Sequence, residues 1–214
     1  MLLDLLLPRR CVVCGAGGAV LCAPCVAALP SLRPPLCVRC GAPTAWPVER
    51  CRECAGRRLA FLSARAAVPY DDTVRRLVRR WKQYGLRSLA AAAADVVAAR
   101  VTRPAVDVVT YVPAEPWRAR SRGHHPAERL ARELADRWAL PCRPLLVRRG
   151  PALRQRGLSR SERQRNPAFS ALETGLCAAL VDDVYTTGAT ADAAARALAG
   201  RVDVVTLART VRRA

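Results

Sequence analysis

From residue 60 onwards, short apolar runs alternate with longer stretches in which apolar residues recur every three or four positions. The runs predict strands and the recurring spacing predicts helices, because a helix returns to the same face every 3.6 residues. The predicted strands span residues 61–70, 106–113, 141–150, 177–183 and 202–211. The predicted helices span residues 71–85, 86–101, 126–140 and 190–200. Strands that alternate with helices, several of them apolar throughout, are typical of a parallel α/β sheet.

The first 58 residues have little periodic apolar pattern and are instead rich in cysteine, glycine and proline. Eight cysteines form four Cys-x-x-Cys pairs: Cys11/Cys14, Cys22/Cys25, Cys37/Cys40 and Cys51/Cys54. Two intervening residues let both sulfurs converge on one ion, and two pairs supply the four thiolates of a structural zinc site. So short a segment buries little surface, and zinc supplies roughly 10–16 kcal/mol of apparent binding free energy. The pairs therefore predict two structural Zn²⁺ ions.

The gaps between the pairs predict that consecutive pairs share a zinc ion, since closing a short loop loses less entropy. The alternative is a cross-brace, in which pairs that are not consecutive share an ion. This organisation predicts a double zinc-ribbon module over residues 1–58 and an α/β domain over residues 59–214. Cys142 and Cys177 stand outside the pairs, and we expect them to be small core residues.

The chain of 214 residues carries 36 basic and 17 acidic side chains, a net charge of +19. Such an excess favours polyanionic partners, namely nucleic acid, phosphorylated ligands or an anionic membrane surface. The opening MLLDLLL lacks the features of a signal peptide and is too short to span a bilayer. We therefore expect a cytoplasmic protein without a transmembrane segment.

The segment VDDVYTTGAT, residues 181–190, combines two kinds of ligand-binding chemistry. In parallel sheets ligands bind at the carboxyl ends of the strands, where Asp182 and Asp183 are predicted to lie. The turn that follows offers hydroxyls and backbone N–H groups to a phosphate at a helix start, while the carboxylates suit the two ring hydroxyls of a ribose. The sequence thus predicts a ribose 5-phosphate site, and the alternative is a Thr-capped turn without a ligand. The predicted phosphate loop comprises Thr186, Thr187, Gly188, Ala189 and Thr190.

This segment resembles the phosphoribosyl-pyrophosphate (PRPP) motif of type I phosphoribosyltransferases. With the Cys-x-x-Cys pairs ahead of it, the chain resembles the ComF family of competence-associated proteins, which join a zinc module to a phosphoribosyltransferase-like domain. The likeness covers nearly the whole chain and extends to RRWKQYG (79–85), YVPAEPWRARSRGHHPAERLA (111–131) and LRQRGLSRSERQRNPAFS (153–170). The chain departs from the family at residues 122–126, where it has RGHHP and many members have Arg-Gly-Phe-Asn-Gln.

The resemblance implies that PRPP binds together with Mg²⁺ and that pyrophosphate is displaced from its anomeric carbon. Asp182 and Asp183 would be the catalytic acids that hold the ribose diol. The pyrophosphate would be bound by Arg118, Arg120 and Arg122, and the Arg-rich segment 148–165 would close over the site. Either His124 or His125 meets the pyrophosphate, or both are turn residues at a helix start.

The family also implies a role in DNA uptake during natural transformation, with contacts to single-stranded DNA and to a helicase-like partner. Segment 148–165 contains seven arginines and one acid, which suits binding to a nucleic acid backbone. Two alternatives stay open: a PRPP-dependent transferase of nucleobase or nucleotide metabolism, and a PRPP sensor without turnover.

Overall fold

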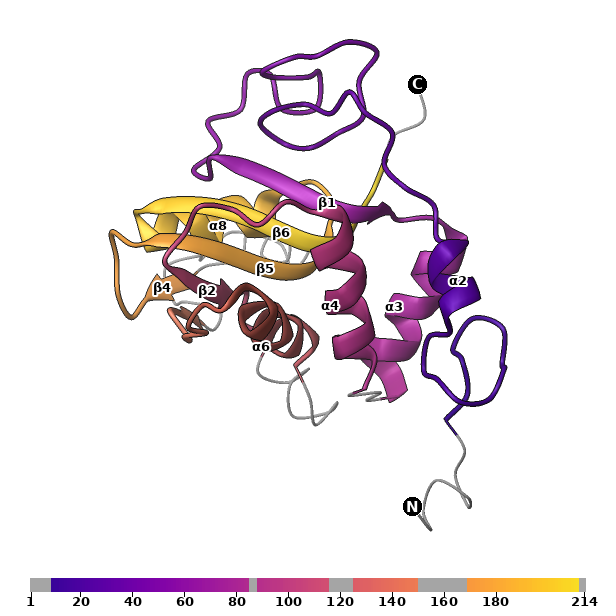
Figure 1. The fold of residues 1–214 in the computed structure, drawn as a ribbon. Coiled ribbons are helices and arrows are strands. Elements are labelled where there is room, and N and C mark those ends of the chain that lie inside the picture. The colour runs from indigo at the N-terminus through magenta and orange to yellow at the C-terminus, as the bar shows by residue number, and fades with distance from the viewer. Residues whose placement is uncertain (1–8, 85–87, 116–124, 150–168, 212–214) are drawn as a thin grey trace, which may run out of the picture.

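The computed structural model describes residues 9–84, 88–115, 125–149 and 169–211 of the chain. A four-stranded sheet in the order β1-β6-β5-β2 forms its centre, and all neighbouring strands in it are parallel (Figure 1). The strands are β1 (Ser63–Pro69), β2 (Val108–Tyr111), β5 (Cys177–Tyr185) and β6 (Arg201–Arg209). The parallel α/β sheet expected from the sequence is confirmed.

Each face of the sheet is covered by different elements, because successive residues of a strand point to opposite sides. In β5, Ala179 and Val181 pack in one core cluster, and Ala178 and Leu180 pack in another. The first cluster includes buried residues of α3 (Asp72–Tyr84), α4 (Leu89–Arg100) and α6 (Pro126–Trp138). The second includes buried residues of α8 (Ala189–Leu198) and of a small antiparallel sheet of β3 (Leu146–Arg148) and β4 (Phe169–Ala171).

Most predicted elements are confirmed, with boundaries that differ by a few residues. Strand β5 runs two residues beyond its predicted end at 183, since Tyr185 still pairs with Arg209 of β6. Gly200 was expected to end the last helix, but α8 ends at Leu198 and Ala199 takes the left-handed cap conformation. Gly200 is instead pressed against the backbone of Leu176, where a Cβ would lie 2.2 Å from the carbonyl oxygen.

The cysteine-rich N-terminal region folds as two lobes, the first lobe (residues 9–29) and the second lobe (residues 36–57), which lie apart in Figure 1. The first lobe contains the short helix α2 (Ala23–Ala27) and packs in the core cluster of α3 and α4. The second lobe packs in the core cluster of α8 and runs beside β1. The two lobes therefore belong to different core clusters, which lie on opposite sides of the sheet.

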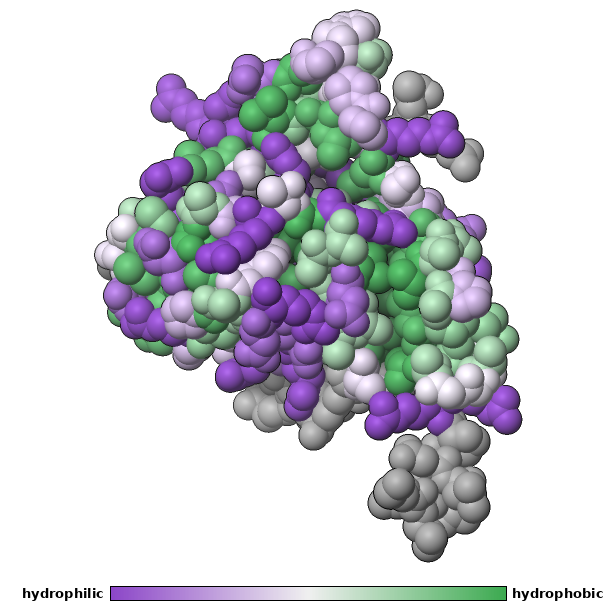
Figure 2. All heavy atoms as spheres, viewed as in Figure 1, coloured by the Kyte–Doolittle hydropathy of each residue, from purple (hydrophilic) through white to green (hydrophobic). Residues whose placement is uncertain are grey.

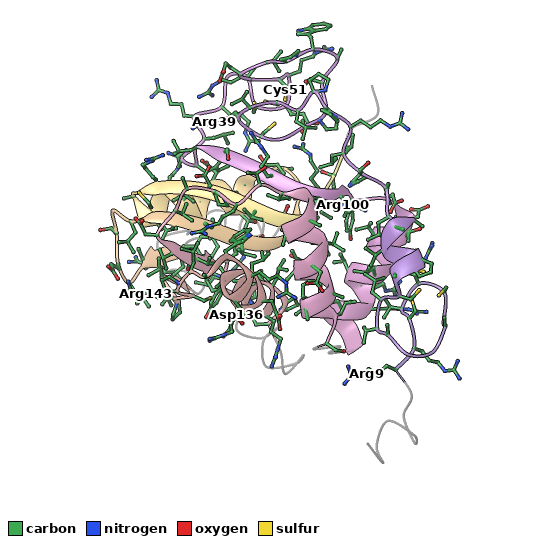
Figure 3. The ribbon with its side chains drawn as sticks, in the orientation of Figure 1. Arg9, Arg39, Cys51, Arg100, Asp136 and Arg143 are labelled. Carbon is green, nitrogen blue, oxygen red and sulfur yellow. The ribbon has the colours of Figure 1, made fainter. Side chains whose placement is uncertain are left out.

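Arginine side chains join the lobes and helices to one another. Arg100, at the end of α4, donates to the carbonyl oxygens of Pro30, Val26 and Leu29 at 2.8, 3.3 and 3.2 Å (Figure 3). Arg137 of α6 pairs with Asp95 of α4, with 2.7 Å between Nη2 and Oδ1. Figure 2 shows hydrophilic side chains gathered over α6 and along the margins of the second lobe.

Cys142 and Cys177 are only half-buried, and of the two Cys142 packs against the core, so the expectation of core residues holds in part. Among the helices in the described ranges, none has the length and apolar character needed to cross a membrane.

Candidate functional site

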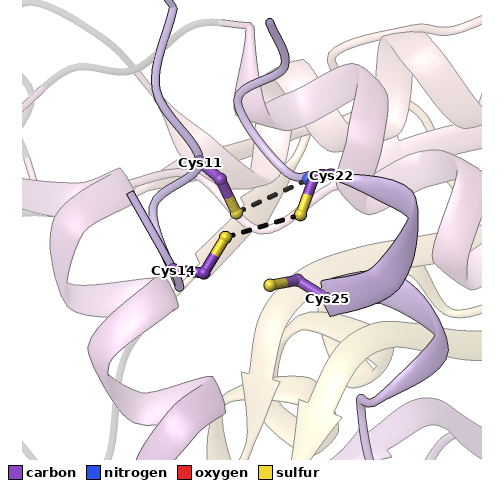
Figure 4. A group of neighbouring side chains, drawn as sticks. All are labelled: Cys11, Cys14, Cys22 and Cys25. Carbon is purple, nitrogen blue, oxygen red and sulfur yellow. Dashed lines mark hydrogen bonds between the residues drawn. The ribbon is translucent and has the colours of Figure 1, made fainter. Parts of the chain in front are cut away.

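The first lobe brings four sulfurs together at its base. The Sγ atoms of Cys11, Cys14, Cys22 and Cys25 all lie within 4.8 Å of one another (Figure 4). The sulfurs of Cys14 and Cys22 are 3.6 Å apart, and the backbone N–H of Cys22 lies 3.5 Å from the sulfur of Cys11. Sulfurs held about 2.3 Å from a tetrahedral zinc lie about 3.8 Å from one another, so this group fits the ion.

The second lobe repeats the arrangement in a more buried setting. Its sulfurs are separated by 3.6 Å between Cys37 and Cys54, 3.4 Å between Cys40 and Cys51, and 4.0 Å between Cys51 and Cys54. All four lie within 4.8 Å of one another. Each group joins two consecutive Cys-x-x-Cys pairs, which confirms sequential pairing and excludes the cross-brace.

The electrostatics of the sulfurs also suit a cation. In the second lobe, burial raises the pKa of the Cys54 thiol to about 11. Burial acts in the same direction on Cys37, yet backbone N–H groups of Cys40 and Cys51 hold the pKa of that thiol at about 7. In the first lobe the pKa of Cys11 is about 6, since backbone N–H groups of Cys14 and Cys22 outweigh burial. Each group thus contains one sulfur that is readily a thiolate, Cys11 or Cys37, beside a thiol of raised pKa, Cys25 or Cys54, whose proton a bound metal ion would displace.

Residues 2–55 match the double zinc ribbon domain. A search of curated proteins gave no match to the chain. The domain match and the two groups of four cysteines together support structural zinc in both lobes, as expected from the sequence.

The double zinc ribbon also contains an internal repeat beyond the cysteine pairs, which the sequence analysis missed. CVVCGA (11–16) and CVRCGA (37–42) are identical in five of six positions. In each, the first cysteine N–H donates to the last alanine carbonyl at 2.8 Å, and the glycine N–H donates to the first cysteine carbonyl. The glycine has a positive φ in both lobes, 79° at Gly15 and 69° at Gly41, so both hexapeptides form the same turn.

The second candidate site is a cleft of about 400 Å³ at the carboxyl end of the parallel sheet. Its walls come from residues that follow β1 and β2, from the end of β5, and from α3, α6 and α8. The polar and charged side chains that line it are Tyr70, Lys82, Glu115, His125, Arg148, Asp182, Asp183, Thr186 and Thr190. The cleft lies where a parallel sheet binds its ligands, as the sequence predicted.

Asp182 and Asp183 lie side by side in this cleft but in different electrostatic states. Burial, together with the adjacent charge of Asp183, raises the pKa of Asp182 well above its ordinary value. Burial would raise the pKa of Asp183 as well, but the charge of Lys82 and its hydrogen bond hold that pKa below its usual range. The backbone N–H of Asp183 also donates to Asp182 Oδ1 at 2.8 Å. The pair thus combines a stable carboxylate with a carboxyl that retains its proton more readily.

Lys82 of α3 forms an ion pair with Asp183, and the sequence analysis did not assign it to the site. The signal was present, because Lys82 is the only lysine in the chain. Arg148 is a second cation in the cleft. It donates to the carbonyl of Pro113 at 3.2 Å, lies 3.6 Å from Glu115, and stacks 5.2 Å from the ring centroid of Phe169.

The predicted phosphate loop divides among three environments. Thr186 and Thr190 line the cleft with the two acids, as predicted. Gly188, with φ 76°, is the N-cap of α8, and a Cβ on it would lie 2.2 Å from Tyr185 Oη. Thr187 faces a small cavity beside the second lobe instead. Gly188 has no side chain to cap α8, and the Ala189 N–H donates to Thr187 Oγ1 at 3.4 Å. The N–H groups of Thr190 and Ala191, which follow in the first turn, are the ones that this helix start offers to an anion.

His125 caps α6, where its Nδ1 accepts from the backbone N–H of Glu128 at 3.1 Å. Its Nε2 contacts the backbone N–H of Ala114, so the ring joins the loop after β2 to α6 while lining the cleft. This is the turn role that the sequence left open. Arg118, Arg120, Arg122 and His124, and all of segment 148–165 after Arg149, lie outside the described residues.

Proposed function

We propose that the cleft binds PRPP together with Mg²⁺ and that the protein is phosphoribosyltransferase-like. The observation that carries this proposal is that Asp182, Asp183, Thr186 and Thr190 line one cleft at the start of α8. A ligand that fills this cleft would meet carboxylates, which bind hydroxyls, and a helix start, which binds anions. A ribose 5-phosphate has both a diol and a phosphate to offer them. A plain Thr-capped turn gives no reason for two adjacent acids beside it, of which Asp183 is buried.

Each group has a chemical role in this proposal. The carboxylate of Asp183, held in its charged form by Lys82, accepts hydrogen bonds from the ribose hydroxyls. The start of α8 and the hydroxyls of Thr186 and Thr190 bind the 5-phosphate. Arg148 and Lys82 place positive charge near the pyrophosphate, beside the arginines 118, 120 and 122 that the resemblance implies. Mg²⁺, when bound with PRPP, supplies further charge neutralisation.

A thermal-shift experiment tests the ligand. At PRPP near 100 times its dissociation constant, with Mg²⁺ present, linkage predicts about 2.7 kcal/mol of added stability. For a chain of this size that corresponds to a rise of roughly 5–11 °C in melting temperature. D183N should fold and show a smaller rise, because an amide is a weaker acceptor for the diol.

The matched control is D203N, at the far end of the sheet, where Asp203 accepts from the Ser63 hydroxyl at 2.6 Å. D203N should keep the full PRPP shift. A wild-type melting curve that PRPP leaves unchanged would remove the ligand assignment. Pyrophosphate release from PRPP, measured with nucleobases, ammonia or nucleic acid as acceptors, then separates a transferase of nucleobase or nucleotide metabolism from a sensor without turnover.

A second proposed function is contact with single-stranded DNA, as in DNA uptake with a helicase-like partner. The net charge of +19 and the seven arginines of segment 148–165 favour it. If about five arginines neutralise phosphates, the logarithm of affinity should fall with the logarithm of salt concentration with a slope near −3.5. Replacing Arg154, Arg156, Arg160 and Arg163 with Ser should make the slope less steep, and a flat response in the wild type would contradict the proposal.

A further inference from the structure

Arg209 is a buried cation at the end of β6, and neither the zinc sites nor the cleft has given it a role. Arg209 is only 1% exposed, and its guanidinium extends to the second lobe. There Nη1 donates to the carbonyl oxygen of Cys40, and Nη2 pairs with Glu53 Oε2 at 2.8 Å. A buried charge is stable only when it is paired and hydrogen-bonded, so this arginine ties β6 to the zinc-binding turn of the second lobe.

The same guanidinium also supports the residue that precedes the phosphate loop. It stacks on the ring of Tyr185, with 5.3 Å between the guanidinium carbon and the ring centroid. Phe61 packs edge-on against the same buried ring, with centroids 6.2 Å apart. Gly188 packs so closely on the Tyr185 hydroxyl that a Cβ would lie 2.2 Å from it. The position of the Tyr185 ring therefore limits where the backbone of loop 186–190 can lie.

The carbonyl groups of the loop are held on the side of the second lobe. Tyr185 and Thr186 carbonyls accept from the backbone N–H and hydroxyl of Thr210, at 2.9 and 3.1 Å. The carbonyl of Thr187 accepts from Arg57 Nη1 of the second lobe at 2.5 Å. In a trans peptide the C=O and the following N–H point in opposite directions. Holding three successive carbonyls on this side therefore turns the N–H groups of residues 186–188 away from the second lobe.

We propose that Arg209 and Arg57 are positioning residues that hold loop 186–190 in its anion-binding conformation by anchoring it to the second lobe. The proposal rests on the proposed function, because it names what prepares that same site. The first lobe contacts helices instead: the Val12 carbonyl accepts from Arg80 of α3, and the carbonyls of Val26 and Leu29 accept from Arg100 of α4.

Hydrogen exchange of the full-length, zinc-loaded protein without PRPP tests the anchoring independently of the ligand. In R57A, the amides of residues 186–190 should exchange about fivefold faster than in wild type, as expected for the loss of about one hydrogen bond. R57K, which keeps a donor at this position, should restore most of the protection. Exchange elsewhere in the sheet should stay unchanged, which a general loss of stability would not allow.

R58A is the matched control, since Arg58 is exposed and adjacent, and only its backbone carbonyl is used, by Arg196. R209M should accelerate loop exchange at least as much as R57A; if R209M fails to fold, the R57A and R57K pair decides. Loop exchange in R57A equal to wild type, with two zinc ions retained, would overturn the proposal. A wild type without a PRPP shift, but with faster loop exchange in R57A, would remove the ligand and leave the anchoring in place.

Discussion

The two lobes contain nearly the same hexapeptide and form the same turn around it, yet they contact the α/β domain in different ways. The first lobe offers backbone carbonyls to arginines of helices: Val12 accepts from Arg80 of α3 at 2.7 Å. The second lobe donates to the loop through Arg57 and accepts Arg209 through Cys40 and Glu53. The same metal-binding turn therefore lies beside helices in the first lobe and beside loop 186–190 in the second.

The cleft is lined both by α3, which the first lobe contacts, and by loop 186–190, which the second lobe contacts. Lys82 reaches it from α3, the helix that the first lobe contacts, and pairs with Asp183. Thr186 reaches it from the loop that the second lobe contacts. The comparison teaches that the cysteine pattern alone identifies the metal, whereas the residues around each lobe decide what the metal stabilises.

The largest expected difference between the lobes comes from removing one zinc ligand in each. A structural zinc contributes roughly 10–16 kcal/mol, comparable to the stability of a whole domain. C40S should release one zinc ion per chain and abolish the PRPP-induced rise in melting temperature, because the loop loses its anchors. C14S should also release one zinc ion but keep most of the rise. Zinc content and thermal melts check both, and the opposite result would break the comparison.

A smaller difference should separate the two turn glycines, which share a positive φ but not their surroundings. A Cβ on Gly41 would lie 2.3 Å from the Ala64 carbonyl oxygen of β1, whereas Gly15 has open space around it. G15A should cost about 1–2 kcal/mol from the backbone alone. G41A should cost about 2–5 kcal/mol, because an overpacking cost of about 1–3 kcal/mol is added. Equal losses in urea-induced unfolding would show that the close approach to β1 is not required.

Substitutions of Asp183 and Asp182 test the side of the cleft to which α3 contributes Lys82. D183N should reduce the free energy of unfolding by about 1–3 kcal/mol at neutral pH, because the amide leaves Lys82 without its anion. The stabilisation from the Asp183 charge is present above the unfolded pKa of about 3.9, and it is lost as pH falls through the lowered folded pKa.

D182N is the contrasting variant, because the folded pKa of Asp182 is raised. The folded state holds this proton more tightly, so stability falls as pH rises from about 3.9 through the folded pKa. D182N removes that fall, and its stability relative to wild type should increase towards neutral pH. Melting curves between pH 4 and pH 8 check this; a constant difference across that range would contradict the raised pKa.

The smallest effect is expected at the exposed surface of the second lobe. Trp46 is 67% exposed, and its contact with Thr44 uses only the backbone carbonyl. W46A should therefore change the free energy of unfolding by no more than about 0.5 kcal/mol. A loss above about 1 kcal/mol would show that the lobe is stabilised at its surface as well as at its base.

Features that depend on local spacing were predictable from the sequence. Short gaps predicted that the pairs Cys11/Cys14 and Cys22/Cys25 form one site. Apolar residues at helical spacing predicted α3, and three of them, Val74, Leu77 and Trp81, are buried. The parallel sheet followed from apolar strands that alternate with helices. The division at residue 58 and the cytoplasmic location stay predictions.

Features that depend on tertiary contacts were not predictable. The hydrogen bond from Arg209 to Cys40 joins residues 169 positions apart, and no spacing rule connects them. The chain has 36 Lys and Arg residues, and nothing in the composition distinguishes the buried Arg209 from the exposed ones. The end of β5 was placed too early for a similar reason, because pairing with β6, and not propensity, extends the strand to Tyr185.

The backbone of the second lobe also covers part of the outer edge of β1, with a consequence for the fate of the newly made chain. The Ala64 N–H donates to the Arg39 carbonyl at 2.9 Å, and Arg65 donates to the Val38 carbonyl at 2.9 Å. At the other margin, Val109 of β2 exchanges hydrogen bonds with Pro141 and Arg143. An open strand edge is a template for pairing with other chains and for aggregation. One cover of this sheet is built around a four-cysteine zinc site, and such sites often fold only with the metal. We therefore expect zinc supply during synthesis to affect how much of the protein remains soluble.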